Sequence, residues 1–234
     1  MKDKDFKKYI VFEDNHLLVV NKPAGLLVQG DKTNDKTLID FTKQYIKYEY
    51  NKPGNVFLGL THRLDRPVSG AVIMTKTSKA LTRVTKAFKN QEVGKTYIAI
   101  CLGKPNASSG IIQNYLLKDG QKNKVRVFKS AQKKAKFSET EYNVLQYTNG
   151  KSLVKIAPKT GRSHQIRVHL SSINIPIIGD LKYGAPKPLS DKSIALHCLN
   201  MELIHPVTKE KISFKASLPE TSFWKPYISF LDKN

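Results

Sequence analysis

A short polar segment, residues 62–70 with the sequence His-Arg-Leu-Asp-Arg-Pro-Val-Ser-Gly, most constrains what this chain can fold into. Apolar, strand-like runs flank it at residues 56–60 and at residues 71–74. Because proline, serine and glycine favour turns, the pattern predicts two strands joined by a loop that carries the charged side chains.

One carboxylate on this loop, that of Asp65, lies between the cations Arg63 and Arg66. Neighbouring positive charges favour the ionised form of a carboxyl group, and an ionised carboxylate can act as a nucleophile or a base. The cations would also attract a polyanion such as a phosphate backbone. The simpler interpretation is a surface turn with a solvated ion pair, which is common and contributes little to stability.

The charge of the whole chain favours the first interpretation. Of 234 residues, 40 are Lys or Arg and 19 are Asp or Glu, which gives a formal net charge of +21. Such an excess indicates a nucleic-acid partner, because neutralised phosphates release counterions. A membrane-surface protein is the alternative, but the sequence shows no long amphipathic helix, lipidation signal or apolar run of membrane length, so we expect no membrane partner.

A basic segment at residues 118–136 is the candidate for gripping phosphates. Apolar residues interrupt its lysines and arginines, so a basic hairpin fits better than a disordered tail. We expect Lys133, Lys134 and Lys136 to contact the phosphates of a nucleic acid, although a solvated hairpin that only aids solubility is the alternative.

A second dense cluster occupies residues 161–170. We expect a helix over residues 162–172, with Arg162, His164 and Arg167 toward its donor-rich side. Helix N-termini favour anions, so this side could bind a phosphate or orient a carboxylate such as Asp65.

Metal and nucleotide-cofactor sites have no support in the sequence. His164 and His169 are five residues apart, which does not place them on one helical face as zinc ligands, and no glycine-rich nucleotide-binding motif occurs. Cys101 and Cys198 lie in apolar surroundings and are interpreted as buried, reduced thiols, so we expect a cytoplasmic protein without metal or cofactor.

The order of apolar patterns predicts an α+β fold with a mixed or antiparallel sheet flanked by helices and loops. Helical patterns cover residues 37–50 and 78–90, and residues 196–216 read as a hairpin. We expect residues 1–9 to be loose and residues 10–234 to form one catalytic domain with a basic cleft.

Taken together, these segments resemble the RluA-type pseudouridine synthases, which isomerise uridine in ribosomal or transfer RNA. Five motifs in the right order carry the resemblance, at residues 20–25, 62–70, 95–97, 160–170 and 178–184. The resemblance covers nearly the whole chain from about residue 10. It is a resemblance to the form of the family that lacks an S4-type domain.

The resemblance implies roles by position. Asp65 matches the catalytic aspartate, Tyr97 the tyrosine that packs on the target uracil, and Arg167 the arginine that pairs with the aspartate. Arg63 matches the residue that fills the space left by the flipped base, and His62 would support the loop. We expect His62, Arg63 and Arg66 to contact RNA.

The family loop commonly has Thr where Val68 stands here, but Asp65 is intact, so activity is expected. The resemblance implies an RNA stem-loop as partner, no metal and no cofactor, and we expect a monomer. Two other functions stay open at this point. A glycosylase or hydrolase would use the same aspartate with water, and for a non-catalytic RNA-binding protein the aspartate would be dispensable.

Overall fold

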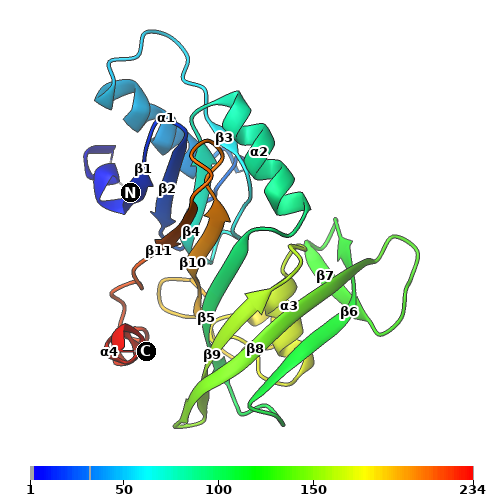
Figure 1. The fold of residues 1–234 in the computed structure, drawn as a ribbon. Coiled ribbons are helices and arrows are strands. Elements are labelled where there is room, and N and C mark those ends of the chain that lie inside the picture. The colour runs from blue at the N-terminus through cyan, green and yellow to red at the C-terminus, as the bar shows by residue number, and fades with distance from the viewer. Residues whose placement is uncertain (1–2, 32, 234) are drawn as a thin grey trace. The chain divides into compact units, whose positions relative to one another are not determined.

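The protein is described by a computed structural model over residues 3–31 and 33–233, which form two compact units (Figure 1). Unit 1 lies within residues 1–94 and 198–219, and unit 2 within residues 95–197 and 220–234. Strands dominate both units and helices accompany them, so the predicted α+β class is confirmed.

Unit 1 holds the N-terminal strands and their helices. Its elements are the 3-10 helix η1 (Asp3–Tyr9), β1 (Ile10–Glu13), β2 (Leu17–Lys22), α1 (Leu38–Glu49), β3 (Gly59–Leu60), β4 (Ser69–Thr75), α2 (Ser78–Lys89), most of β10 (Leu196–Ile204) and β11 (Lys211–Lys215). The strand order is β1–β2–β4–β10–β11, and β3 pairs with β4. The hairpin predicted over residues 196–216 is confirmed, because β10 and β11 pair antiparallel.

The core of unit 1 is built on β2 and β4. Residues 17–20 and 71–74 are all completely buried, as continuous apolar runs are when both faces of a strand are covered. The two strands pair antiparallel from Leu17 opposite Thr75 to Lys22 opposite Gly70. Strand β2 therefore continues to Lys22, directly before Pro23.

Gly70 is required where the loop of residues 61–68 enters β4. Its φ is +118°, and a Cβ there would lie 2.3 Å from the carbonyl oxygen of Cys198 on β10. Only glycine accepts this backbone angle with a neighbouring strand so close. The position of the loop is thereby tied to the packing of the sheet.

Both helices predicted in unit 1 are present, and their caps explain where they begin. Thr37 precedes α1 and forms a capping box with Asp40, while the Oγ1 of Thr77 accepts the backbone N–H of Ala80 in α2. Residues 3–9, expected to be loose, form η1 because Phe6 is buried with its ring 5.5 Å from that of Tyr45.

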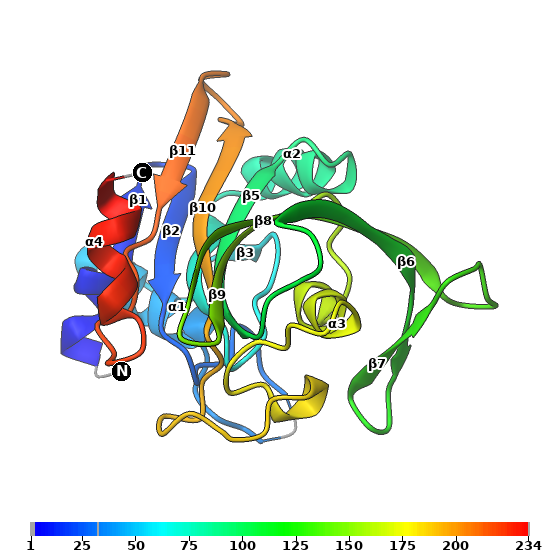
Figure 2. The same ribbon diagram turned by 90° about the horizontal axis from the view of Figure 1, so that it is seen from below.

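Unit 2 is an antiparallel sheet with a helix against it. Its elements are β5 (Gly94–Leu102), β6 (Ser109–Asp119), β7 (Lys124–Phe128), β8 (Lys136–Thr148), β9 (Lys151–Pro158), α3 (Gln165–Ser172), the 3-10 helix η2 (Leu181–Tyr183) and α4 (Lys225–Lys233). The strand order is β5–β9–β8–β6–β7. Figure 2 shows α3 on the concave side of the curved sheet formed by β6, β7 and β8.

The basic hairpin predicted at residues 118–136 is present in its first half. Asp119 of β6 pairs with Lys124 of β7, while the second half connects β7 to β8. An apolar cluster fastens this hairpin to α3 and η2. Its members are Leu116, Val125, Val127, Val168 and Tyr183.

Candidate active site

The loop between β3 and β4 presents Asp65 at the surface of unit 1. Leu64 and Val68 are buried on either side of it, and Asp65 itself is partly exposed. The backbone N–H of Val68 donates to the carbonyl of Asp65 at 3.0 Å, which closes a turn. Apolar anchors before and after the aspartate therefore fix the loop, and Asp65 between them stays partly exposed. Val68 serves as an anchor without needing the hydroxyl of a threonine.

His62 and Thr61 attach the start of this loop to β4. The Nε2 of His62 accepts the backbone N–H of Ile73 at 3.0 Å, and the hydroxyl of Thr61 donates to the carbonyl of Ile73 at 2.6 Å. The imidazole also stacks on Phe88 of α2 with ring centroids 4.9 Å apart. His62 thus supports the loop, as the resemblance implies.

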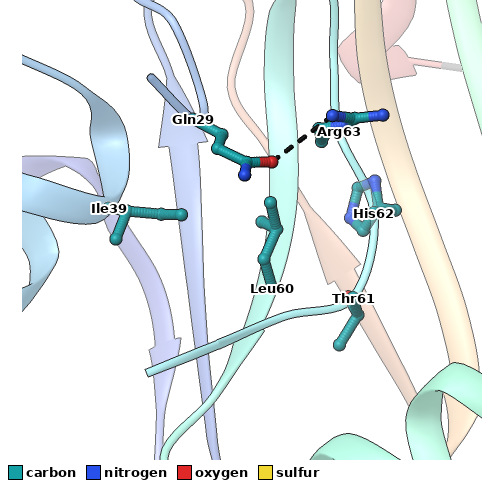
Figure 3. A pocket seen from close by; sticks show the side chains of 6 residues that line it. All are labelled: Gln29, Ile39, Leu60, Thr61, His62 and Arg63. Carbon is teal, nitrogen blue, oxygen red and sulfur yellow. Dashed lines mark hydrogen bonds between the residues drawn. The ribbon is translucent and has the colours of Figure 1, made fainter. Parts of the chain in front are cut away.

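A pocket of about 370 Å³ opens beside the same loop in unit 1 (Figure 3). Ile39 and Leu60 supply apolar surface, and polar groups come from Gln29, Thr61, His62 and Arg63. The Nη1 of Arg63 donates to the Oε1 of Gln29 at 3.3 Å. This bond is long and both side chains are exposed, so it holds the guanidinium only weakly.

Arg66 connects the loop to the turn that follows β2. Its Nε donates to the carbonyl of Gly25 at 3.0 Å, and its Nη2 lies 2.8 Å from a carboxylate oxygen of Asp35. Both partners of that ion pair are about half exposed, so the pair contributes little to stability. The guanidinium therefore stays accessible to an anion.

The structure reveals Lys22 as a member of this site that the residue-level argument missed. Its side chain is fully buried, and its Nζ donates to the carbonyl of Arg66 in the loop. The one sign of this role in the sequence is the place of Lys22 in the motif at residues 20–25. Apart from that motif, a lysine before Pro23 is typical of the end of a strand.

Unit 2 carries the other two residues that the resemblance marks as catalytic. Tyr97 lies on β5, opposite Ile156 of β9, and is 9% exposed. Arg167 lies on α3 and is buried. Asp65 belongs to unit 1, so the candidate catalytic residues are divided between the two units.

A buried carboxylate that the sequence analysis missed holds Arg167. The Nε and Nη2 of Arg167 donate to the two carboxylate oxygens of Asp180 at 2.7 and 2.8 Å. The guanidinium also lies over the ring of Tyr183, 5.1 Å from its centroid. A two-pronged ion pair of this kind fixes the plane of the guanidinium.

The helix that carries Arg167 begins later than predicted, at Gln165 instead of residue 162. The reason is that His164 adopts a left-handed backbone with φ +50° and ψ +20°. His164 therefore does not share a helical face with Arg167. Tyr183 joins them instead, because its hydroxyl lies 2.7 Å from the Nδ1 of His164.

The remaining basic candidates lie at the edge of unit 2. The Nε of Arg162 donates to the carbonyl of Phe137 at 2.9 Å. Lys133 and Lys134 lie on the connection between β7 and β8, and Lys136 begins β8; all three are exposed. They are placed to meet an anion from solvent.

A buried polar network fastens α3 to the sheet of unit 2. The Nε2 of His169 lies 2.9 Å from the Oδ1 of Asn114 and 3.0 Å from the hydroxyl of Ser138, and its Nδ1 lies 2.9 Å from the hydroxyl of Thr140. Burial lowers the pKa of His169 to about 4, so the ring is neutral near neutral pH. His169 is therefore a structural residue.

Other kinds of site have no support in the described residues. No group of three or more His, Cys, Asp or Glu side chains among residues 3–31 and 33–233 is arranged to hold a metal ion. None of the helices in that part of the chain is long and apolar enough to cross a membrane. Cys101 and Cys198 are buried and not joined in a disulfide, and burial raises the pKa of the Cys101 thiol.

Comparison with known proteins places the chain in a family. Residues 16–172 match the RNA pseudouridylate synthase family. The ribosomal large subunit pseudouridine synthase D of Borreliella burgdorferi is 34% identical over 95% of this chain and 67% of its own length. Synthase C of Buchnera aphidicola subsp. Schizaphis graminum is 33% identical over 97% of this chain and 72% of its own.

A solved structure extends the comparison to the fold. The human RNA pseudouridylate synthase domain containing 4 has a TM-score of 0.78 and 28% identity, covering 93% of this chain and 91% of that one. The fold and the matches define an RNA-modifying isomerase. The chain belongs to the RNA pseudouridylate synthase family, which confirms the resemblance drawn from its motifs.

Proposed function

We propose that this enzyme converts uridine to pseudouridine in ribosomal RNA, with Asp65 as the catalytic carboxylate. The observation that carries the assignment is the built loop of unit 1, in which buried Leu64 and Val68 hold Asp65 at the surface between two exposed arginines. The names of the curated relatives support ribosomal over transfer RNA.

The reaction is an isomerisation, so it needs no electron acceptor and the proposal includes no nucleotide cofactor. The N1–C1′ glycosidic bond breaks, the uracil rotates, and a C5–C1′ bond forms; the C5 proton leaves and N1 gains a proton. Asp65 either bonds to the sugar or base or removes the C2′ proton. Tyr97 stacks on the base and can accept the C5 proton, and Arg167 favours an ionised carboxylate.

Base flipping belongs to the same proposal, because a stacked uridine does not expose its glycosidic bond to a side chain. Arg63 is the proposed wedge that fills the vacated space. Its exposed guanidinium makes a long bond to Gln29 (Figure 3), so little is lost when this bond breaks and the side chain moves into the RNA.

Basic and imidazole side chains around the site would hold the RNA backbone. We assign this role to Arg66 and His62 in unit 1 and to a second set in unit 2. That set consists of Arg162, His164, Lys133, Lys134 and Lys136. We further propose that both units form one catalytic domain that acts as a monomer, and that it works in the cytoplasm, where thiols such as Cys101 and Cys198 stay reduced.

The test is release of tritium from ribosomal RNA labelled at C5 of uridine, with wild type beside Asp65→Asn. Wild type should release tritium, and the variant should release it about 10³-fold more slowly or not at all, as when a catalytic group is removed. RNA affinity should change little, because the cations remain. Multiple turnover by Asp65→Asn would exclude Asp65 as the catalytic carboxylate.

The products of the same reaction separate the alternatives. A glycosylase would release free uracil without loss of the C5 hydrogen, and a binding protein would do neither. Unlabelled transfer RNA added as competitor, and labelled transfer RNA used as substrate, would show whether the ribosomal assignment holds.

A further inference from the structure

Lys22 places a fully buried ammonium group beside the loop of Asp65 in unit 1. Its side chain is 0% exposed, and its Nζ donates to the carbonyls of Pro23 at 3.0 Å, Leu26 at 2.8 Å and Arg66 at 3.3 Å. A protonated lysine has three N–H donors and no acceptor. Three carbonyl partners therefore match the charged form of Lys22.

These carbonyls belong to two separate segments of unit 1. Two come from the turn that follows β2, and one comes from the residue directly after Asp65. Gly25 joins the same segments, because its N–H donates to the carbonyl of Arg66 at 2.8 Å and its own carbonyl accepts the Nε of Arg66. Lys22 thus completes a seam between the turn and the loop.

Burial, more than the neighbouring charges, sets the pKa of Lys22. Burial lowers its pKa to about 7; the carboxylate of Asp65 opposes the lowering, and the guanidinium of Arg66 adds to it. Loss of the proton would leave two N–H donors for three carbonyls, and the longest bond, to Arg66, is the weakest of the three. It would also remove a positive charge that attracts Asp65.

We propose that Lys22, in its protonated form, is a positioning residue that holds the Asp65 loop in its productive conformation. Because the protonated form is the active one, the rate of isomerisation depends on pH through Lys22. This role rests on the proposed function of Asp65. Lys22 does not touch the substrate; it acts through the carbonyl of Arg66 and through its charge.

A purely structural role makes a different prediction. Burying a charge costs free energy of folding, so Lys22→Met removes one cost and adds another, since buried acceptors that lose a donor are also unfavourable. Lys22→Met should therefore fold, although the three carbonyls lose a partner. If Lys22 only supported the fold, the variant would lose stability and keep the pH profile of the wild type.

The experiment measures kcat/KM for tritium release between pH 5.5 and 9.5, since this ratio reports the ionisations of the free enzyme. Wild type should lose activity above an apparent pKa near 7. Lys22→Arg, which stays charged at these pH values, should lack this limb. Lys22→Met should be at least tenfold slower at pH 6.5 and should also show no loss of activity above pH 7. The matched control is Lys47→Met, at an exposed lysine, which should follow wild type.

A second readout does not need activity. The unfolding free energy of wild type minus that of Lys22→Met should rise between pH 6 and 9, because the unfolded lysine then binds more protons than the folded one. Two outcomes would overturn the proposal and leave the proposed function standing. One is a wild-type activity that does not change with pH, and the other is a Lys22→Met variant with the rate and pH profile of wild type. No product from wild type at any pH would instead overturn the proposed function, and this role with it.

Discussion

Tyr97 shows how one side chain can be tested without disturbing its surroundings. It is 9% exposed on β5, so Tyr97→Phe keeps the ring and its packing and removes only the hydroxyl. If that hydroxyl accepts the C5 proton, tritium release in a single turnover should slow about 10²-fold or more, with RNA affinity unchanged. Tyr48→Phe, at a tyrosine that is 71% exposed, is the control. Unimpaired release by Tyr97→Phe would assign the proton to another acceptor.

The ion pair of Arg167 and Asp180 gives a prediction about stability. Their side chains are 7% and 1% exposed, so Asp180→Asn takes a paired carboxylate charge away from a buried guanidinium. We expect a loss of about 3–5 kcal/mol in the free energy of unfolding, measured by urea denaturation. Glu141→Gln breaks the exposed pair with Lys159 and should cost less than about 1 kcal/mol. Equal losses in the two variants would contradict the structural account.

Among single residues, the sequence selected candidates for chemistry but did not predict their surroundings. Asp65, flanked by cations, and Arg167, in a basic cluster, were selected from residue type and motif. The pair of Arg167 with Asp180 was not predicted, because Asp180 lies thirteen residues away along an irregular segment that gives no periodic signal. The burial of Lys22 also escaped prediction, since lysine is almost never fully buried without partners and those partners are backbone carbonyls.

At the scale of elements, periodicity located the helices but not every end. Helices α1 and α2 lie where the patterns predict them, because each has a threonine cap before an apolar face. Helix α3 begins at Gln165, whose side chain bonds Thr160, the backbone of Arg162 and Thr140. These contacts hold residues 160–164 outside the helix, and they depend on a strand distant in sequence.

The network around His169 ties the docking of α3 to pH. The pKa of His169 is lowered from 6.5 to about 4 in the folded protein, so the unfolded chain binds more protons between these values. The stabilisation is complete above about pH 6.5 and is lost as the pH falls toward 4, with an upper limit of about 3 kcal/mol. Urea denaturation at pH 4.5 and 7 should show this loss in wild type. His169→Gln should be less stable at pH 7 and show a smaller difference; an unchanged difference would place the titration elsewhere.

At the scale of the whole molecule, composition predicted the partner and the motifs predicted the family. The α+β class followed from apolar runs such as residues 71–74, whose burial the structure confirms. The division into two compact units was not predicted, because no linker or change in composition marks residues 94–95 or 197–198. A boundary that cuts through β10 leaves no trace in a strand pattern.

The net charge of +21 predicts that RNA binding weakens as salt is added. Replacing exposed Lys133, Lys134 and Lys136 with glutamine should weaken binding at low salt. It should also lower the slope of log affinity against log salt by about 2, since each lost phosphate contact on a single strand removes roughly 0.7. The measurement is a filter-binding titration of RNA at several salt concentrations.

A control of equal charge separates local contacts from the overall field. Glutamines at Lys209, Lys211 and Lys215, on and beside β11 in unit 1, remove the same three charges from outside the proposed interface. Long-range attraction depends on total charge, so both variants should slow association, but only the first should change the slope, because only contacts that displace counterions contribute to it. An unchanged slope in the first variant would mean that Lys133, Lys134 and Lys136 serve only solubility. Equal changes of slope in the two variants would show that the RNA covers more of the protein than the proposed set of residues.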